Sequence, residues 1–439
     1  MAGLFTTFQD VVRYLEAIPK FSQKGADAAH FSLDHMEKFC ELMGNPHKSF
    51  RSIHVAGSNG KGTTCQMLAS VYEQAGYKTG LYTSPHLVRF NERVRVNAEE
   101  IPDHEVLLFF RQFENLLEEV PLTYFEISTC LAFWYFEKKS CEICLIEVGL
   151  GGRLDATNVI DPVLSVITSV SRDHTEILGD TITEIASEKA GIIKQSRPVV
   201  TGFLSGEALK VIIETAVKKD AKVINTEHFQ PKIQNEIILL RKQDSGIIKI
   251  DAKNRKRVDR LNIAISLAVV QELGSELPVS ETEFIAGIES LECRYRHHAH
   301  FEKLSPDLEW YYDGAHNPEA MESLIEQVEF MRNRRDPVWI LSMMKDKAVA
   351  ELLENFLPYT NVYYIETGSE RCAKRNQILS ILPNTRVFSS ENPEFLKLLD
   401  GFKSKLVIFA GSFYFYSEVK KWMASLKSSD QAKNTGLRR

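Results

Sequence analysis

Short apolar, β-rich runs alternate with helical stretches along most of this chain, and this alternation limits its possible folds more than any other feature. The runs typical of buried strands first occupy residues 52–56, 144–148, 163–170 and 198–202. A second series lies at residues 310–312, 338–341, 362–365 and 405–410. Strands that alternate with helices form mostly parallel sheets, which the helices cover on both faces. The sequence therefore predicts an α/β protein with two such series.

The length of 439 residues fits two domains, because a domain usually has about 100–200 residues. We place a P-loop ATPase-like, mostly parallel domain at residues 1–298 and a smaller Rossmann-like α/β domain at residues 299–439. Within the first domain, two short β-rich runs between residues 229 and 250 predict a small hairpin. From about residue 427 the chain lacks large apolar residues except its last leucine, so a disordered tail is expected.

Composition excludes several classes of protein. The 53 Lys and Arg against 59 Asp and Glu give a net charge of −6, so no basic field predicts binding to nucleic acid or to a membrane surface. The longest wholly apolar run, residues 130–136, is far shorter than the roughly 20 residues of a membrane-spanning helix. The N-terminus has no basic stretch and meets an acid at Asp10, which argues against a signal peptide. We expect a cytoplasmic monomer that acts on small molecules.

The strongest local signal is a glycine-rich loop between a strand and a helix. It reads Gly57-Ser58-Asn59-Gly60-Lys61-Gly62-Thr63-Thr64. Glycines let successive backbone N–H groups turn toward one anion, and the N-terminus of the following helix adds partial positive charge. Lys61 would meet the β- and γ-phosphates of a nucleotide, and Thr63 or Thr64 would bring a hydroxyl to the phosphate or a metal. A glycine-rich turn without a ligand is the alternative.

Two polar residues lie at or near the carboxyl ends of strands, where open α/β sheets place ligands. Glu147 stands inside an otherwise apolar run, where an unpaired carboxylate is costly to bury. His174 follows another strand end. From the residues alone, the alternative for Glu147 is a salt-bridged core acid. A lone histidine such as His174 more often packs or forms hydrogen bonds than binds a metal.

A third group of polar and aromatic residues opens an apolar helix. It reads Thr123-Tyr124-Phe125-Glu126. The rings of Tyr124 and Phe125 are able to flank a flat ligand, and Glu126 to bond its polar edge. Aromatic residues near a helix start more often belong to the core, so the residues alone favour packing.

The phosphate loop and six further segments together resemble the Mur ligase superfamily, in the form of folylpolyglutamate synthase and dihydrofolate synthase. These segments follow the family order, at residues 83–96, 147–158, 173–179, 188–192, 313–318 and 411–413. The resemblance implies an ATP-dependent ligase of the bifunctional bacterial type. Such an enzyme joins L-glutamate to dihydropteroate or to tetrahydrofolate polyglutamates through an acyl phosphate, in a cleft between two domains.

The resemblance also implies two Mg²⁺ ions. Ser84 and Glu147 are implied as ligands of the Mg²⁺ that bridges the nucleotide phosphates, and His174 as a ligand of the second. Lys189 matches a lysine that is carbamylated in this superfamily. The alternative is an unmodified lysine that pairs with a nearby acid on a surface helix. A carbamate is an anionic oxygen donor that Mg²⁺ accepts, whereas a lysine cation would be repelled.

Roles for the remaining residues come from the same resemblance. Asn262 is implied at the adenine, where the plain alternative is a solvent-facing helical asparagine, and Asp313 is implied at the ribose. A pterin-bearing substrate would lie against residues 123–126 and against Leu154, Asp155 and Ala156. His316, as a catalytic residue, and Ser412 are implicated in handling glutamate.

The chain departs from the family pattern at one position. The family usually has an arginine that contacts an ATP phosphate thirteen residues before the aspartate matched by Asp313, and His300 stands there. Either His300 replaces this arginine, or Arg294 or Arg296 reaches the phosphate from the linker. We expect one of the two arginines to serve.

Two other functions remain open at this point. A Mur ligase of cell-wall synthesis would share the chemistry, but it is expected to carry an N-terminal sugar-nucleotide domain, and only 56 residues precede Gly57. A non-catalytic nucleotide-binding paralogue is the second, for which His300 is the one indication. Release of phosphate that requires both glutamate and a pteroate separates these functions.

Overall fold

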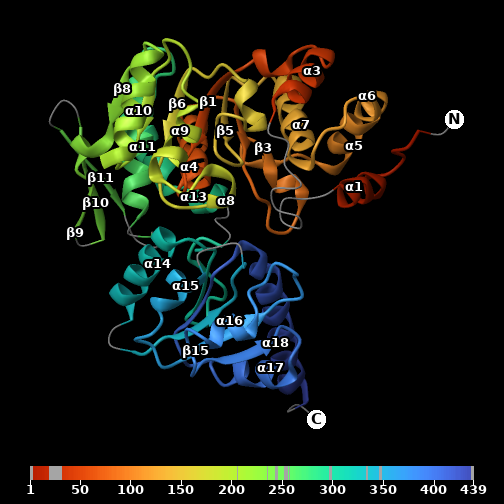
Figure 1. Cartoon of the computed structure of the whole chain (residues 1–439), viewed down its shortest axis with the longest axis vertical. Coiled ribbons are helices and arrows are strands. Elements are labelled where there is room, and N and C mark those ends of the chain that lie inside the picture. Colours follow the sequence, from red (N-terminus) through yellow and green to blue (C-terminus); the bar gives the residue numbers. More distant parts are fainter. Residues whose placement is uncertain are drawn as a thin grey trace. The chain divides into compact units, whose positions relative to one another are not determined.

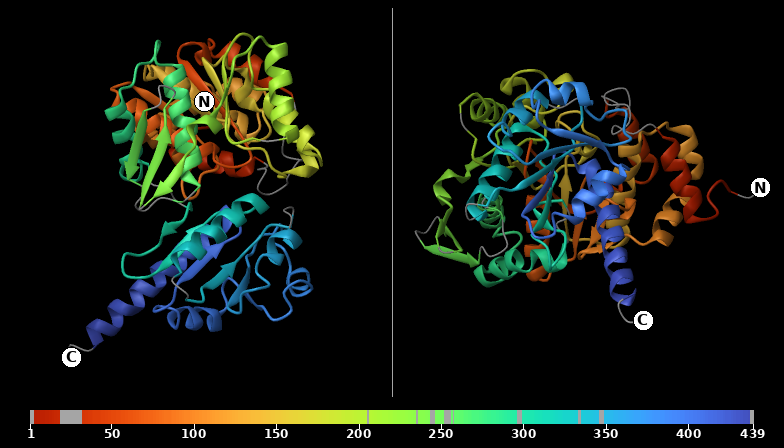
Figure 2. Two further views of the ribbon diagram at one scale, coloured as in Figure 1. Left: turned by 90° about the vertical axis from the view of Figure 1, so that its left-hand side faces the viewer. Right: turned by 90° about the horizontal axis from the view of Figure 1, so that it is seen from below.

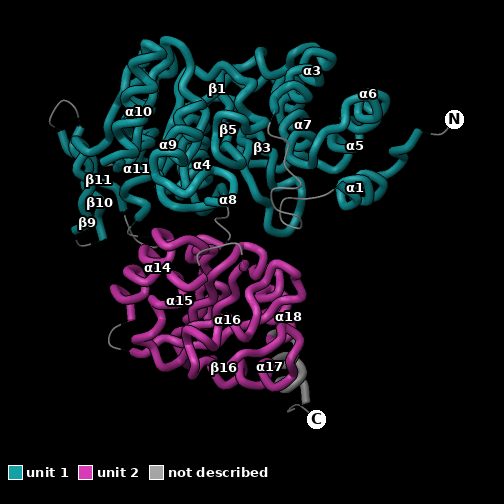
Figure 3. Tube along the Cα trace, in the orientation of Figure 1, with its two compact units in different colours: residues 1–296 teal, residues 297–439 magenta. Residues whose placement is uncertain are grey.

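The computed structural model of this protein divides into two compact units, residues 1–296 and residues 297–439 (Figure 3). It describes residues 3–18, 32–204, 206–234, 236–242, 246–251, 256, 258–295, 299–332, 335–345 and 349–436, with side chains through residue 426.

An eight-stranded sheet organises the first unit (Figure 1), in the order β4-β3-β2-β5-β1-β6-β7-β8. The six strands from β2 to β8 are parallel, and β3 and β4 add an antiparallel edge. The strands are β1 (Arg51–Ala56), β2 (Thr79–Tyr82), β3 (Val94–Val96), β4 (Glu99–Glu100), β5 (Ile143–Glu147), β6 (Leu164–Ile167), β7 (Val199–Thr201) and β8 (Val223–Asn225). The predicted parallel α/β architecture is confirmed.

Helices cover both faces of this sheet. Apolar residues of α4, α11 and α12 form one core cluster with residues of β1, β2, β5 and β6. On the other face, a cluster rich in phenylalanine joins α1, α3, α5 and α7 to the sheet. The helices are α1 (Phe8–Ala17), α3 (Asp34–Leu42), α4 (Lys61–Gln74), α5 (Asp103–Gln112), α6 (Glu114–Glu119), α7 (Tyr124–Lys138), α8 (Thr175–Leu178), α9 (Ile182–Ala190), α10 (Gly206–Lys218), α11 (Asp259–Glu272), α12 (Glu281–Glu289) and α13 (Leu291–Arg294). Short 3₁₀ turns are η2 (Pro46–Lys48), η3 (Phe90–Arg93), η4 (Ala156–Val159) and η5 (Thr226–Phe229).

A small antiparallel sheet, drawn in green in Figure 2, belongs to the same unit. It consists of β9 (Lys232–Gln234), β10 (Ile237–Arg241) and β11 (Ile247–Asp251). Alternate residues of β10 and β11 are buried in the core that α4 shares with the large sheet, namely Ile238, Leu240, Ile248 and Ile250. The predicted hairpin is confirmed, with β9 as an additional strand.

The second unit has a six-stranded sheet in the order β12-β13-β17-β14-β15-β16. All its pairs are parallel except β12 with β13. The strands are β12 (Glu302–Lys303), β13 (Trp310–Asp313), β14 (Val338–Leu341), β15 (Val362–Glu366), β16 (Arg386–Ser389) and β17 (Val407–Ala410). The other elements are α14 (Pro318–Met331), α15 (Val349–Glu354), α16 (Arg375–Leu379), α17 (Pro393–Asp400), η6 (Phe413–Phe415) and α18 (Tyr416–Gly436).

Helix α18 corrects one expectation. It continues to Gly436, through the segment from residue 427 that composition predicted to be disordered. The first turns of α18 pack against the unit through Tyr416, Val419 and Trp422, which are buried. A helix that is already nucleated extends at little cost through residues such as Lys, Gln and Ala, which favour helix without needing a core.

No helix in the described part of the chain combines the length and the apolar character needed to cross a lipid bilayer.

Candidate active site

The glycine loop joins β1 to α4, and its glycines are required by close contacts. Gly60 caps α4 with a φ of +82°, in the left-handed region that favours glycine. A Cβ at Gly57 would lie 1.9 Å from the Thr168 hydroxyl oxygen. The loop therefore leads directly into the N-terminus of a 14-residue helix, whose first N–H groups have no partner within the helix. Such a helix start after a glycine loop is suited to bind a phosphate group.

A segment that follows β6 fixes the loop from the side. Ser58 donates its backbone N–H to the carbonyl of Ser169 (3.0 Å), and the N–H of Asn59 donates to the Ser169 hydroxyl (2.9 Å). The Thr168 hydroxyl donates to the carbonyl of Asn59 (2.6 Å). Sequence reasoning missed Thr168 and Ser169, because their role depends on β1 and β6 being neighbours in the sheet.

Lys61 and the two threonines lie at the start of α4. The Lys61 ammonium donates to the carbonyls of Gly57 (2.9 Å) and Ser58 (3.3 Å), so it lies over the loop. Thr63 and Thr64 are buried. Thr64 donates a long hydrogen bond of 3.5 Å to Asn262.

Asn262 is buried against the loop and does not face solvent as a surface asparagine would. A Cβ at Gly60 would lie 2.6 Å from its Oδ1, which gives a second reason for that glycine. The structure thus places Asn262 of α11 beside the phosphate loop. Its predicted contact with adenine stays a prediction.

Glu147 is the last residue of β5 and lies beside this loop. In the sheet it pairs with Val55, two residues before Gly57. Its carboxylate accepts the backbone N–H of Ser84 (2.9 Å), and a Cβ at Gly62 would lie 3.4 Å from it. Burial raises the pKa of Glu147 to about 7, although the charge of Lys61 acts in the opposite direction. A cation that enters the site would therefore stabilise the ionised form of Glu147 and lower its pKa.

Lys189 is buried in α9, so its side chain does not lie on the exposed side of that helix. Burial lowers the pKa of Lys189 to about 7, and repulsion from the Lys61 charge lowers it further, whereas Asp173 and Glu188 act in the opposite direction. A large share of this side chain is therefore an uncharged amine near neutral pH. Among ordinary lysines that state is rare, and it is the nucleophilic one.

His174 follows Asp173 at the start of the short helix α8. Its backbone is left-handed, with a φ of +51°, and its Nε2 lies 3.8 Å from an oxygen of Asp173. The structure brings Ser84 to Glu147 and places Asp173 within electrostatic reach of Lys189. His174 is linked to these groups through its neighbour Asp173, a residue that the sequence motif contained but to which we assigned no role.

The donor set fits a magnesium ion that enters with its nucleotide. Within the described ranges, no three His, Cys, Asp or Glu side chains form a ready-made metal site. Mg²⁺ commonly takes only one or two protein carboxylates and completes its shell with phosphate oxygens and water. Glu147, buried and desolvated beside the glycine loop, is able to supply one such carboxylate.

The predicted pterin segment starts α7 and is partly occupied by helix capping. Thr123 accepts the N–H of Glu126 (3.3 Å), and the Glu126 carboxylate accepts the N–H of Thr123 (2.7 Å). The ring of Phe125 packs on Gly149, where a Cβ would lie 2.4 Å from it. The guanidinium of Arg93 lies 5.3 Å from the centre of the Tyr124 ring. The predicted substrate contacts of these residues stay predictions.

Asp155 lies at the start of η4, opposite Leu150. Its carboxylate accepts the N–H of Leu150 (2.8 Å), the N–H of Thr157 (3.0 Å) and the hydroxyl of Thr157 (2.5 Å). Ala156 is buried and Leu154 half-buried. Burial raises the pKa of Asp155, and these hydrogen bonds act in the opposite direction. They bring residues 149–157 together as one turn.

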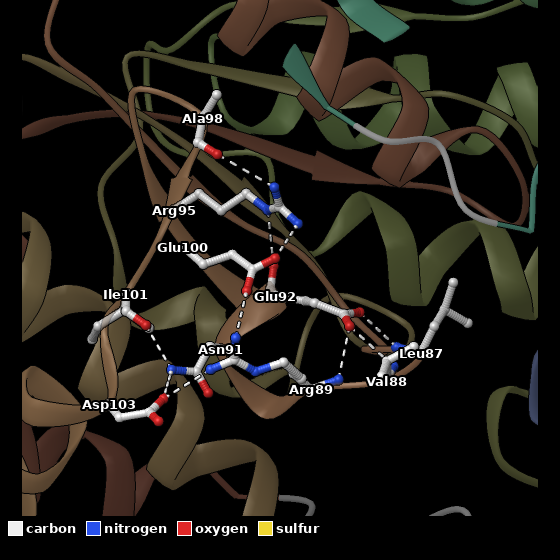
Figure 4. Close-up of polar contacts among 10 residues, drawn as sticks. All are labelled: Leu87, Val88, Arg89, Asn91, Glu92, Arg95, Ala98, Glu100, Ile101 and Asp103. Atoms are coloured by element: carbon white, nitrogen blue, oxygen red, sulfur yellow. Dashed lines mark hydrogen bonds and ion pairs between the residues drawn. The ribbon is translucent and has the colours of Figure 1, made fainter. Parts of the chain in front are cut away.

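A single carboxylate holds the loop between β2 and β3 (Figure 4). The oxygens of Glu92 accept the backbone N–H groups of Leu87 (2.8 Å), Val88 (3.0 Å) and Arg89 (2.7 Å). Side chains tie the same loop to the strand and helix that follow, through the pairs Arg89–Asp103, Asn91–Ile101, Asn91–Asp103 and Arg95–Glu100. Successive N–H groups around one anion form a nest, so the loop that begins with Ser84 is fixed from within.

In the second unit, two predicted histidines contact one ring. His316 and His300 pack edge-on against Phe413, with ring centroids 5.4 Å and 5.6 Å away. The Nδ1 of His316 lies 2.8 Å from the carbonyl oxygen of Gly314. Phe413 belongs to a quoted motif, but its place between the two histidines follows from the fold of the unit.

Asp313 and Ser412 lie at the carboxyl ends of two neighbouring parallel strands of the same unit. Asp313 is the last residue of β13 and accepts the N–H of Ala315 (2.9 Å). Ser412 follows β17 and accepts the N–H of Tyr414 (3.1 Å). Both are buried at the carboxyl edge of the sheet, the edge at which α/β sheets bind ligands.

Arg294 is engaged away from the phosphate loop. Its guanidinium lies 2.8 Å from the carboxylate of Glu73, which also accepts the Tyr295 hydroxyl. Glu73 lies near the C-terminal end of α4, about 18 Å along the helix from Lys61 at its start. Arg296 lies outside the described residues. The pairing of Arg294 with Glu73 therefore does not support the expectation that Arg294 reaches the ATP phosphate.

Comparison with known proteins gives matches over most of the chain. The family described as "Mur ligase middle domain" matches residues 55–268, and "Mur ligase, glutamate ligase domain" matches residues 301–413. The chain is 32% identical to a dihydrofolate synthase/folylpolyglutamate synthase of Bacillus subtilis, over 95% of this chain and 99% of that protein. It is 30% identical to the folylpolyglutamate synthase of Lacticaseibacillus casei, over 96% and 100% of the two chains.

Solved structures agree with these relatives. Escherichia coli FolC in complex with ADP, without folate substrate, superposes with a TM-score of 0.84 at 29% identity, covering 98% of this chain and 100% of that one. The same protein in complex with DHPP and ADP gives 0.82 at 28% identity, with 97% and 100% covered.

Proposed function

Because the chain belongs to the folylpolyglutamate synthase/dihydrofolate synthase family of the Mur ligases, we propose that it is an ATP-dependent ligase that joins L-glutamate to dihydropteroate or to folates. The observation that carries this proposal is the convergence of Lys61, Glu147 and Lys189 beside a phosphate loop, in a chain whose relatives include an enzyme with bound ADP. A regulatory nucleotide-binding protein has no need of a buried acid and a buried amine at this place.

The reaction has two bond-forming steps. A carboxylate oxygen of the pteroate or folate attacks the γ-phosphorus of ATP, and the bond to the β-bridging oxygen breaks, which releases ADP and leaves an acyl phosphate. The uncharged amine of glutamate then attacks the acyl carbon. The C–N bond forms, the C–O bond to phosphate breaks, and the amine loses a proton.

Lys61 and the start of α4 supply positive charge for the first step. The loop N–H groups and the helix N-terminus would face the phosphates. The Lys61 ammonium would stabilise the negative charge that builds on the oxygen bridging the β- and γ-phosphates. Asn59 is held by Ser169, so the loop is preorganised before the nucleotide arrives. The two threonines after Lys61 bring hydroxyls to the same region.

Glu147 and Ser84 would hold the magnesium ion that accompanies ATP, with His174 at a second ion. Bound Mg²⁺ neutralises phosphate charge. What this chain contributes is an acid already stripped of water and aimed by the Ser84 N–H. The carboxylate gains most from a cation in such a place, because little water remains to compete.

Lys189 is proposed to carry a carbamate. An uncharged amine attacks carbon dioxide, the N–C bond forms and one proton leaves, so an amine with its pKa lowered to about 7 is suited to this reaction. The product is an anion. It replaces the repulsion between Lys189 and Lys61 by attraction, and it offers oxygen to a hard cation.

The substrate's flat ring is proposed to lie at the start of α7, near Tyr124, Phe125 and the turn that contains Asp155. This region joins aromatic surface to a few fixed polar groups, as small-molecule sites do. In the second unit, Asp313 is proposed to serve the ribose, and His316 and Ser412 the incoming glutamate. The Phe413 ring that contacts both histidines would orient them.

Phosphate release tests the proposal. The purified protein is incubated with Mg²⁺-ATP and L-glutamate, with dihydropteroate or tetrahydrofolate present or omitted, and phosphate and the new amide are measured together. We expect phosphate to form in a one-to-one ratio with the amide, only when all three substrates are present. A cell-wall ligase would need a nucleotide-sugar peptide instead, and a non-catalytic paralogue would release nothing. Either result would exclude the proposed function.

A further inference from the structure

A chain of three buried polar side chains runs behind the turn that contains Asp155. His54 lies in β1, Thr157 in η4, and neither exposes any surface to solvent. The Nε2 of His54 is 2.8 Å from the Thr157 hydroxyl oxygen, which is 2.5 Å from Oδ1 of Asp155. The neighbours of His54 along β1, Ile53 and Val55, are apolar core residues. A histidine in the middle of such a strand calls for a physical reason.

The direction of the hydrogen bonds follows from their partners. Asp155 already accepts the backbone N–H groups of Leu150 and Thr157, as an ionised carboxylate does. A carboxylate only accepts, so the Thr157 hydroxyl must donate to it. The lone pairs of the same hydroxyl then face His54, whose Nε2 must carry the hydrogen and donate. The order is therefore His54 N–H to Thr157 O–H to Asp155.

The other ring nitrogen shows that this arrangement has a cost. Nδ1 of His54 is buried and has no hydrogen-bond partner among the described residues. Burial also lowers the pKa of His54 to about 3, with the nearby charge of Lys194 acting in the same direction, so the ring is neutral. A buried acceptor without a partner destabilises the fold, whereas an apolar side chain of similar shape would not. Stability alone does not account for His54.

The chain of bonds ends on the proposed substrate pocket. Asp155 fixes the backbone of Leu150, and Gly149 before it is the residue on which the Phe125 ring packs. Glu147 stands only two residues earlier, at the end of β5. A shift of Asp155 would therefore move the backbone that supports Phe125.

We propose that His54 is a positioning residue for the pteroate site, which acts through Thr157 to fix Asp155 and the Gly149–Leu150 backbone under Phe125. This inference rests on the proposed function, because it assigns residues to the pocket of that substrate. It predicts that pteroate binding depends on a donor at position 54, while the nucleotide site does not.

Two pairs of variants test it. His54→Leu removes the donor and His54→Gln restores one near the position of Nε2, while Thr157→Val and Thr157→Ser do the same for the hydroxyl. Michaelis constants for dihydropteroate and ATP are measured for each, together with dihydropteroate binding without ATP and the thermal midpoint. The matched controls are His47→Leu and Thr226→Val, a buried histidine and a buried threonine of the same unit that are not part of this chain of bonds.

We expect His54→Leu and Thr157→Val to raise the dihydropteroate Michaelis constant and dissociation constant about tenfold, the loss of roughly one hydrogen bond to a charged group. The Gln and Ser variants should recover most of this, and the ATP constant should stay within about twofold throughout. His54→Leu should keep or raise the thermal midpoint, because it removes a buried ring nitrogen without a partner in the described structure and leaves the Thr157 hydroxyl bonded to Asp155.

Three results would overturn the inference. Unchanged dihydropteroate constants in both removal variants would show that the chain of bonds does not reach the pocket. If the Michaelis constants for dihydropteroate and ATP rise together in His54→Leu and the thermal midpoint falls, as in the control variants, then His54 has only a structural role. A wild-type protein that neither binds nor ligates dihydropteroate would overturn the proposed function itself. This outcome is seen in the wild type without any variant, so it is not confused with a failure of the His54 inference.

Discussion

Lys189 and Lys61 lie close enough for their charges to repel one another, and this repulsion adds to the burial that lowers the pKa of Lys189 to about 7. Lys61 belongs to the phosphate loop, whereas Lys189 comes from α9, more than a hundred residues later. Two like charges held close together destabilise the fold, so stability does not explain why these two lysines are neighbours. The pair becomes favourable once Lys189 carries a negative group, which makes its modification the sharpest prediction of the site.

Lys189 is expected to bind carbon dioxide as a carbamate. With ¹³C-labelled bicarbonate, the active protein should show one carbamate signal in the carbonyl region of its NMR spectrum. The signal should grow as pH rises through about 7, since the neutral amine then becomes the main form. Lys189→Ala should lack both the signal and the activity, and a small carboxylate such as acetate should restore part of the activity.

Lys194→Ala is the matched control, because Lys194 is a half-buried lysine of the same unit that donates to the carbonyl of Asn158. This variant should keep the signal. A wild-type spectrum without any carbamate at pH 8, in protein that is fully active, would contradict the assignment.

Lys61→Ala is expected to abolish ligation and leave the fold intact. Among the described residues, the Lys61 ammonium donates hydrogen bonds to two loop carbonyls, so its loss costs little stability. The charge on the β- and γ-phosphates, in contrast, loses its partner. The rate of amide formation and the circular dichroism spectrum measure the two effects. Activity close to that of the wild type would mean that the phosphate loop has been misassigned.

Glu147→Gln should raise the Mg²⁺ concentration needed for half-maximal activity steeply. The amide keeps the shape and an oxygen for the Ser84 N–H, but it removes the negative charge that a hard cation needs. Glu105→Gln serves as the control, since Glu105 is also buried but pairs with Lys138 and Lys139. The idea fails if both variants titrate with Mg²⁺ as the wild type does.

Arg294→Ala is expected to weaken the fold and leave the Michaelis constant for ATP unchanged. It leaves the Glu73 carboxylate short of one partner, at a cost of about 1–3 kcal/mol in the free energy of unfolding, measured in urea. If His300 serves the phosphate instead, His300→Arg should lower the ATP constant by roughly ten- to a hundredfold at most, because arginine keeps its charge and offers two parallel donors. A rise in the ATP constant of Arg294→Ala would reverse this assignment.

Glu92→Gln should loosen the loop that begins with Ser84. An amide offers one accepting oxygen where the carboxylate accepts three N–H groups with two, and its NH₂ would face a donor. Because Ser84 is proposed to help hold the magnesium ion, we expect a several-fold rise in the Mg²⁺ concentration needed for half-maximal activity and faster proteolysis of residues 84–92. Glu100→Gln is the control, since Glu100 belongs to the same network but, among the described residues, bonds to the Arg95 guanidinium and to no backbone N–H of the loop. Equal effects of both variants would show that the nest is not what orders the loop.

Several elements were predictable from local sequence. An apolar run predicts strand β1, glycines predict the loop after it, and a periodic apolar pattern predicts α4. All three signals lie between residues 51 and 74. Glu147 was a candidate because a lone acid inside an apolar strand is costly unless it has a task. The motif order then identified the family, since spacing along the chain is itself a property of sequence.

The partners of these residues were decided by the tertiary structure. Thr168 and Ser169 hold the phosphate loop because β6 lies beside β1, and Arg294 is drawn to Glu73 because α13 packs at the far end of α4. Composition predicted disorder from residue 427, where α18 continues, because composition does not register a helix nucleated by the buried residues before it.

The sequence by itself determined which residue types stand at strand ends and helix starts, because backbone preferences and apolar periodicity act between near neighbours. Only the tertiary structure decided which of those residues meet, and therefore their charge states. The amine of Lys189 and the carboxylate of Glu147 owe their shifted pKa values to burial by segments far away in the chain. His54 gave no signal among its neighbours in β1. Its role appears only when η4 folds back across the strand and sets a hydroxyl and a carboxylate in line with its ring.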